Sequence, residues 1–338
     1  MIESGCNTPA PNMRGALSIS VVMCTYNGAR YLHQQIDSIL SQTYPIQEII
    51  IQDDGSTDDT LLILSNYQQR DSRIHIYNNE CGQHGINANF FSAMRRAKGD
   101  YIATADQDDI WEPKKLEMQA AAIGDKWLCS GLSVPFSDDG FPVSPDLRTP
   151  CYHLIRCTYI CPLPGHTMLF RREMLSYLNH VKGVTLYYDC QLACLAAAKE
   201  SIAYVPRPLV NFRRHADAAT ATRPVGHRLI SSSAWQYFCL SFFRHKELQA
   251  LVRRRFKMVL PFLEQFPFNS PSLDAAKYMS RLQIQRGPLA FFKKIVFFVQ
   301  HQHCLFYTEE RRPVIRFFRA VFFVFSCGYY YRGQLKKK

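Results

Sequence analysis

Apolar strand-like runs that end in polar clusters and lead into helical patterns constrain this chain more than any other feature. Residues 18–24 (SISVVMC) form a β-branched run that TYNG follows directly. Residues 48–51 (EIII) lead into DDGSTD, and residues 100–105 (DYIATA) lead into DQDD. Amphipathic stretches separate these runs, and this alternation predicts parallel βαβ units in an open α/β sheet.

The polar clusters fall where such sheets bind ligands, in the crevice beyond the carboxyl ends of the strands. Asp106, Asp108 and Asp109 stand within one four-residue stretch. Carboxylates this close repel one another, and a hard cation such as Mg²⁺ or Mn²⁺ relieves the repulsion. The alternative is an acidic turn in which an Asp caps a helix from about Trp111 to Met118.

The first two clusters have the chemistry to hold a nucleotide. Asp53 and Asp54 could accept hydrogen bonds from a base or a ribose, while Thr25, Tyr26 and Asn27 could supply a stacking face and polar contacts. The segment D-G-S-T-D is also a good turn followed by a helix cap. The residues alone leave both interpretations open.

Composition excludes several classes of protein. A chain of 338 residues with 47% hydrophobic and 20% charged residues is typical of a folded globular protein. No apolar run approaches the roughly 18 to 20 residues of a membrane-spanning helix. Residues 1–16 are expected to form a disordered tail and not a secretory signal. The 12 cysteines include no C-x-x-C pair, which favours reduced thiols in a cytosolic protein over a disulfide scaffold or a zinc site.

The positive charge is concentrated at one end of the chain. Residues 226–338 contain 20 Lys and Arg against 5 Asp and Glu, a net +15, while the whole chain carries +12. This region also interleaves Phe and Tyr blocks with the basic residues, a pattern that suits the surface of an anionic membrane. Plain packing on the main domain is one alternative. Nucleic acid is the weaker one, because no helix-turn-helix, RNP or zinc-finger pattern accompanies the charge.

Five segments resemble, in order and spacing, the successive motifs of family 2 glycosyltransferases: VVMCTYNGARYLHQQIDSILSQTY, EIIIQDDGSTDDT, AKGDYIATADQDDIWEPKKL, GHTMLFRR and YYD. The resemblance covers about residues 18–215, and D-Q-D-D-I-W is similar to the version in bacterial rhamnosyltransferase-like enzymes that build surface polysaccharide. It implies a GT-A domain over residues 17–225, with an open mixed sheet flanked by helices. Residues 226–338 would then form a basic, aromatic, helical region on the membrane surface.

The resemblance also implies roles for the polar clusters. It places residues 25–27 in the nucleotide pocket, Asp54 on the pyrimidine base and Asp53 beside it. Asp106 and Asp108 would form the DXD motif, the first near the ribose and the second on the metal. Asp109 would be a further metal ligand.

Three later segments complete the implied site. Asp189 occupies the place of the family's catalytic base, and its alternative role is to cap the helix that follows. Gly165 and His166 match a segment that borders the acceptor. Arg214 and His215, in a basic segment that begins at residue 213, would close over the diphosphate, with simple surface charge as the alternative.

These expectations combine into an inverting, non-processive glycosyltransferase that uses Mg²⁺ or Mn²⁺ and a UDP or dTDP sugar. The Q-x-x-R-W signature of processive synthases is missing from the sequence. The expected acceptor is a glycan carried on polyprenyl diphosphate, and the expected location is the cytoplasmic face of a bacterial cell membrane. A nucleotidyltransferase and an inactive sugar-nucleotide-binding protein are the alternatives.

Overall fold

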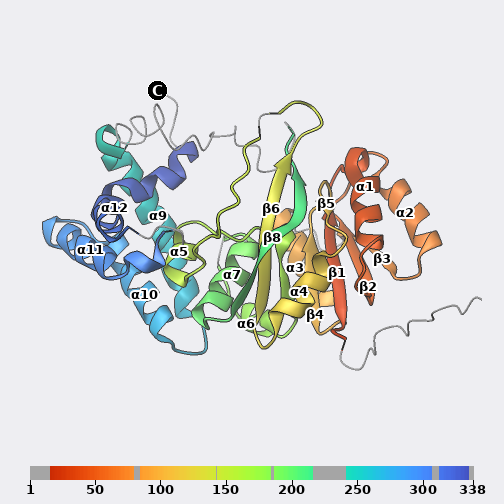
Figure 1. Ribbon diagram of the computed structural model, residues 1–338, viewed down its shortest axis with the longest axis horizontal. Coiled ribbons are helices and arrows are strands. Elements are labelled where there is room, and N and C mark those ends of the chain that lie inside the picture. Colours follow the sequence, from red (N-terminus) through yellow and green to blue (C-terminus); the bar gives the residue numbers. More distant parts are fainter. Residues whose placement is uncertain are drawn as a thin grey trace, which may run out of the picture.

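A computed structural model describes residues 16–79, 84–141, 143–183, 186–215, 241–306 and 312–334 of the protein (Figure 1). All but the last residue of the predicted N-terminal tail therefore lie outside the described part. No helix among the described residues is long and apolar enough to cross a bilayer.

An eight-stranded mixed sheet runs through the molecule in the order β3-β2-β1-β4-β7-β6-β8-β5. The strands are β1 Ile19–Thr25, β2 Glu48–Asp53, β3 Ile74–Asn78, β4 Tyr101–Ala105, β5 Ile110–Trp111, β6 Leu128–Phe136, β7 Leu169–Arg171 and β8 Ile202–Arg213. β1 pairs in parallel with β2 and β4, whereas β7 is antiparallel to both β4 and β6. This confirms the open mixed α/β sheet that the resemblance implied.

Helices cover both faces of the sheet (Figure 1). They are α1 Ala29–Leu40, α2 Thr60–Arg70, α3 Ile86–Arg96, α4 Lys115–Ile123, α5 Leu154–Tyr159, α6 Met174–Leu178, α7 Tyr188–Ala198, α9 His245–Glu264, α10 Pro271–Ile284, α11 Pro288–Gln300 and α12 Pro313–Ser326. Side chains alternate along β1, so Val21 and Met23 pack with α1, α2 and α4, while Val22 packs with α3 and α7 on the other face.

The described part of the C-terminal region, residues 241–306 and 312–334, is helical, as predicted, and its helices extend the core on the α3 and α7 side of the sheet. Tyr159 of α5 makes edge contacts with Phe256 of α9 and Phe323 of α12, with ring centroids 4.8 and 5.1 Å apart. The helical region therefore packs, partly through aromatic rings, on α5 and α7, which cover the second face of the sheet. The division of the chain into a catalytic domain and an appended region stays a prediction.

One local alternative was wrong, and one strand was not predicted. Trp111 lies in the short strand β5 and α4 begins only at Lys115, so the acidic residues before it precede a strand and do not cap a helix from Trp111. Residues 128–136 were not among the predicted strands, and they form β6 although they contain Pro135. β7 pairs only with Leu128 and Cys129 of β6. None of the described strands therefore needs a hydrogen bond from the backbone nitrogen of Pro135, and the proline is tolerated.

Candidate active site

The end of β1 forms one wall of the site. Asn27 has a positive φ of 47°, a conformation that Asn tolerates better than most residues. Its side-chain Oδ1 accepts a hydrogen bond from the Thr57 N–H (2.8 Å), and its own N–H donates to the Ser56 hydroxyl (2.8 Å). The Tyr26 ring stays 57% exposed, so it is available to stack on a planar ligand.

The two carboxylates after β2 are both engaged by protein donors. Asp53 is 1% exposed and accepts hydrogen bonds from the Thr25 hydroxyl (2.7 Å) and from the backbone N–H groups of Gly55 and Ser56 (2.9 and 2.7 Å). Any contribution of Asp53 to nucleotide binding must therefore act through the turn that it shapes.

Asp54 contacts residues of the segment between β3 and α3. Its carboxylate accepts hydrogen bonds from the Asn79 amide (2.5 Å) and the Gly85 N–H (2.8 Å), and lies 3.0 Å from Nδ1 of the exposed His84. His84 is a neighbour that the sequence did not suggest. The expected contact between Asp54 and a base stays a prediction.

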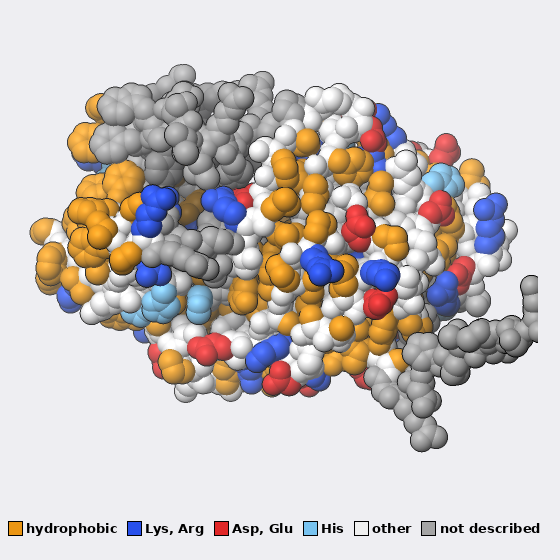
Figure 2. Space-filling model, viewed as in Figure 1, with side chains coloured by type: hydrophobic (Ala, Val, Ile, Leu, Met, Phe, Trp, Pro, Cys, Tyr) orange, Lys and Arg blue, Asp and Glu red, His pale blue; other side chains and the backbone are white. Residues whose placement is uncertain are grey.

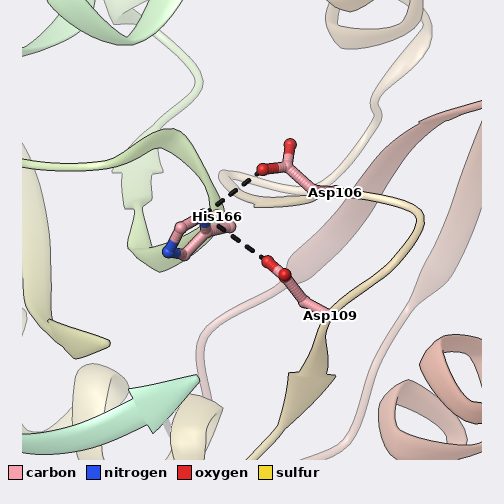
Figure 3. Close-up of side chains that lie close together, drawn as sticks. All are labelled: Asp106, Asp109 and His166. Atoms are coloured by element: carbon pink, nitrogen blue, oxygen red, sulfur yellow. Dashed lines mark hydrogen bonds and ion pairs between the residues drawn. The ribbon is translucent and has the colours of Figure 1, made fainter. Parts of the chain in front are cut away.

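The acidic turn between β4 and β5 lies between two histidines from later in the chain. His166 Nδ1 lies 3.3 Å from Asp106 Oδ2 and 3.5 Å from Asp109 Oδ2 (Figure 3). On the other side, His215 Nε2 lies 3.0 Å from Asp108 Oδ2. Asp106, Asp109 and His166 each offer one ligand atom, and these atoms all lie within 4.8 Å of one another.

Burial and mutual repulsion disfavour the ionised form of the carboxyl groups in the acidic turn. Burial, together with the neighbouring Asp106 and Asp108, raises the pKa of Asp109 to about 8, despite the opposing effect of His166. Burial and Asp106 likewise raise the pKa of Asp108. Burial alone would lower the pKa of His166, but Asp109 and Asp106 outweigh it and raise that pKa. A bound cation would offset the burial and the mutual repulsion, and would therefore favour the ionised form of these carboxyl groups.

The residues of this turn fit a divalent metal. Asp109 Oδ2 is buried and has no hydrogen-bond partner within the described structure, although such atoms are rarely left unpaired. Carboxylate oxygens suit Mg²⁺ and Mn²⁺, and an added imidazole nitrogen suits the transition metal better. The donor set is thus consistent with a divalent cation and does not identify which one.

Arg213 holds the acidic turn in place. Its backbone N–H donates to Asp109 Oδ1 (3.0 Å) and its Nε donates to the Asp108 carbonyl (2.9 Å). The guanidinium lies between the rings of Tyr31 and Phe136, 4.5 Å from each centroid, and forms an ion pair with Asp138.

The other members of the basic segment differ in exposure. His215 is 8% exposed and its ring lies 4.9 Å from that of Tyr31. Simple surface charge is therefore the wrong description of both Arg213 and His215. Arg214 is half-buried near Phe141 and Phe212. Its expected contact with a diphosphate stays a prediction.

Asp189 lies in the first turn of α7, one residue inside the helix start at Tyr188, and the N-cap residue is Tyr187. The Asp189 carboxylate accepts a hydrogen bond from the Cys190 N–H (2.6 Å). Burial, with the nearby Cys190 thiol and Asp106, raises the pKa of Asp189 to about 7. A carboxyl group that titrates near neutral pH is well suited to accept a proton.

Gly165 brings the acceptor-side segment close to this helix. The segment Gly165–Thr167 forms a 3₁₀ turn, and the Gly165 carbonyl accepts a hydrogen bond from the Thr104 hydroxyl (2.6 Å). A Cβ at this position would collide with the Tyr188 hydroxyl, so only Gly fits. The turn thereby places His166 next to Asp106 and Asp109 of the acidic turn.

Gln107, the middle residue of the acidic motif, was not among the expected site residues. Its side-chain oxygen accepts from the Tyr26 N–H (2.8 Å) and its amide donates to the Tyr26 carbonyl (3.1 Å). A Cβ at residue 28 would collide with this side chain. Gln107 therefore connects the ends of β1 and β4. The signal for this contact in the sequence was the Gly of T-Y-N-G, because a residue with a Cβ would leave no room for the Gln107 side chain.

An open mixed sheet with an acidic turn at the carboxyl edge of its parallel strands is the arrangement of a GT-A type glycosyltransferase. Residues 20–178 match the family model described as glycosyl transferase family 2. A Haemophilus influenzae protein named an uncharacterized glycosyltransferase is 32% identical over 195 residues, which cover 55% of this chain and 75% of that one. The chain belongs to glycosyltransferase family 2.

Other relatives match a smaller part of their own length. The putative teichuronic acid biosynthesis glycosyltransferase TuaG of Bacillus subtilis is 35% identical over 136 residues, which cover 39% of this chain and 53% of the relative. The chain thus spans about half the length of this relative.

Two solved structures share the fold over most of the chain. S. aureus TarS 1-349 in complex with UDP has a TM-score of 0.53 at 15% identity and covers 95% of this chain and 93% of its own. The mannosyltransferase PcManGT from Pyrobaculum calidifontis, in complex with GDP-Man and Mn²⁺, has a TM-score of 0.51 at 16% identity and covers 98% and 92%. At these identities the likeness shows the fold.

Proposed function

We propose that this glycosyltransferase transfers a single sugar from a nucleoside diphosphate donor to a glycan acceptor, with a divalent metal and with inversion at the anomeric carbon. One observation carries the proposal. The acidic turn of Asp106, Asp108 and Asp109 lies between two buried histidines, near Asp189, a carboxyl group with a raised pKa.

The donor would bind at the carboxyl ends of β1, β2 and β4. Tyr26 offers an exposed ring, and Asn27 and Asp54 would offer polar atoms to the nucleotide. Support comes from the fold relatives, which are described in complex with UDP, UDP-GlcNAc, or GDP-Man and Mn²⁺. The sequence resemblance favours a UDP or dTDP sugar for this chain.

The metal would be held by Asp108 with His215, and by Asp106 and Asp109 with His166. Mg²⁺ or Mn²⁺ bound there supplies positive charge for the diphosphate as it departs. Arg213 keeps Asp108 and Asp109 in position through its hydrogen bonds to the backbone and side chain of the turn. Arg214 and His215 would add positive charge on the same side of the site.

Asp189 would serve as the general base. As the acceptor hydroxyl oxygen bonds to the anomeric carbon, its proton moves to the Asp189 carboxylate, and the bond from that carbon to the diphosphate oxygen breaks. A single displacement of this kind inverts the anomeric centre. Gly165 and His166 would border the acceptor, as the motif resemblance implies.

The acceptor would be a growing bacterial surface glycan, such as lipopolysaccharide, carried on polyprenyl diphosphate. The motif resemblance and a relative named for teichuronic acid biosynthesis support a surface polysaccharide. The missing Q-x-x-R-W signature supports the addition of one sugar or a few. The enzyme would work as a peripheral protein on the anionic, cytoplasmic face of the cell membrane.

A thermal-shift screen of the full chain with UDP, dTDP, GDP and CDP, each with and without Mn²⁺, tests the donor site. We expect one pyrimidine diphosphate to raise the melting temperature only when Mn²⁺ is present. If no nucleotide stabilises the folded protein, the acidic turn is not a donor site and the proposal fails. Stabilisation by a nucleoside triphosphate alone, with release of pyrophosphate, would instead identify a nucleotidyltransferase.

A further inference from the structure

Helices α11 and α12 each have two apolar sides, and only one of them is used in the core. Their inward side buries residues such as Phe298 and Phe323, which pack edge to face with centroids 5.1 Å apart. Their outward side carries a second apolar row at helical spacing: Leu289, Phe292 and Val296 on α11, and Val314, Phe317 and Phe318 on α12. We call these six residues the docking face.

The two rows lie on neighbouring helices. Phe291 of α11 contacts Phe325 of α12 edge to face, with centroids 5.3 Å apart, so the helices pack side by side. Figure 2 shows hydrophobic side chains gathered at the left end of the molecule, where Figure 1 places these helices. Leu289, Phe292 and Phe318 are 66, 63 and 64% exposed. A group of large exposed apolar side chains marks a surface that contacts something other than water.

The charge around the docking face has a single sign. Neither α11 nor α12 contains an Asp or a Glu. Lys293 is exposed beside Phe292, and Arg312 and Arg319 are exposed at and within α12. Basic side chains that flank exposed aromatic and aliphatic residues complement a surface that is apolar below and anionic at its rim. An acidic protein partner would match the charge but not the apolar rows.

We propose that the docking face rests on an anionic phospholipid bilayer, with α11 and α12 lying in the plane of the headgroups. The Phe and Leu side chains enter the boundary between headgroups and acyl chains, and the basic side chains contact lipid phosphates. Neither helix is long and apolar enough to cross the bilayer, so contact is limited to one leaflet. The proposal rests on the proposed function in one respect, since a lipid-linked acceptor stays in that leaflet.

Flotation of the full chain with lipid vesicles tests this proposal. The vesicles contain phosphatidylcholine alone or phosphatidylcholine mixed with phosphatidylglycerol. We expect binding to the anionic vesicles, and a loss of at least about tenfold in affinity for the double variant Phe292→Ser/Phe318→Ser. The control Leu62→Ser/Leu147→Ser removes two side chains of similar exposure (62 and 57%) from other parts of the surface and should bind like the natural protein.

A charge variant separates the two contributions. Lys293→Gln/Arg312→Gln should weaken binding to the anionic vesicles by roughly fivefold for each charge removed, and should leave any binding to neutral vesicles unchanged. Absence of binding to anionic vesicles by the natural protein overturns the proposal. So does equal binding by the docking-face variant and the control.

Two further measurements distinguish a lipid surface from a second copy of the chain, and the docking face from the donor site. The natural protein could be a dimer that does not bind vesicles, with the docking-face variant a monomer. In that case the face joins two copies of the chain and the proposal is wrong. Nucleotide binding with Mn²⁺ is measured on the same variants. If a variant loses vesicle binding but still binds nucleotide, the substitution has affected the docking face and not the donor site. If no variant and not even the natural protein binds nucleotide, the proposed function fails, whatever the result with vesicles.

Discussion

The acidic edge of the sheet and the docking face are opposite cases: the first buries polar groups, and the second exposes apolar side chains to solvent. At the sheet edge, Asp109 and His166 are buried with unpaired polar atoms. On α11 and α12, large apolar side chains face outward. Each arrangement sacrifices stability, and such local conflicts with folding rules tend to mark functional surfaces. One chain can thus reserve charge for one ligand and apolar surface for another.

The largest effect is expected at the sheet edge from Asp189→Asn. If Asp189 is the general base, UDP release from a UDP-sugar in the presence of lipid-linked oligosaccharides should fall about 10² to 10⁴-fold. Nucleotide binding should be retained, because the substitution preserves shape. Asp125→Asn, which changes a carboxylate that is 91% exposed, is the matched control. Undiminished turnover in Asp189→Asn would remove the base from the mechanism.

Two phenylalanines of α11 sharpen the comparison within a single helix. Phe298 is fully buried, so Phe298→Ala should lower the free energy of unfolding by about 3 to 5 kcal/mol. Phe292 faces outward, so Phe292→Ala should change it by less than about 0.5 kcal/mol. Denaturant titration measures both values. A large loss for Phe292→Ala would show that the docking face contributes to folding and is not reserved for a partner.

The buried carboxyl groups predict a pH-dependent penalty at the sheet edge. Folded Asp109 keeps its proton up to about pH 8, whereas an unfolded Asp ionises near about pH 3.9. Between these values the folded state binds more protons, so the free energy of unfolding falls as pH rises through this window. Asp109→Asn, measured in EDTA, should therefore raise the melting temperature by a few degrees more at pH 8 than at pH 5. An equal change at both pH values would show that Asp109 ionises normally.

A smaller effect is expected for Gln107→Ala. Losing the two hydrogen bonds to Tyr26 should loosen the contact between the ends of β1 and β4. If the loss weakens nucleotide binding by about 0.5 to 1.5 kcal/mol, the net contribution of one typical hydrogen bond, nucleotide affinity should fall about two- to tenfold. Gln68→Ala, which changes an amide on α2 outside this contact, is the control. Unchanged affinity would mean that the nucleotide does not depend on this junction.

Local patterns made much of the fold and site predictable. The apolar runs of β1, β2 and β4 and the polar clusters at their ends lie next to one another in sequence, so the sheet edge and its acidic turn could be located. β6 was not predictable, because Pro135 argues against a strand. Pro135 is tolerated only because β7 ends before it reaches this residue, and the sequence does not show where β7 ends.

Long-range pairings could not be predicted. His166 meets Asp106 across 60 residues and His215 meets Asp108 across 107. Nothing local to either histidine specifies these contacts. The burial of Arg213 and the raised pKa of Asp189 likewise arise from packing between distant elements. Sequence motifs identified most of the site residues, but only the structure shows which acidic and basic side chains among them lie in contact.

Calorimetric titration of UDP and dTDP into the full chain, with Mn²⁺ and then with EDTA, tests the central claim most directly. We predict binding of one of these nucleotides that requires Mn²⁺ and that Asp108→Asn weakens strongly, while Asp125→Asn leaves it unchanged. Binding that is equally tight in EDTA, or insensitive to Asp108→Asn, would contradict the assignment of the acidic turn as a metal and donor site.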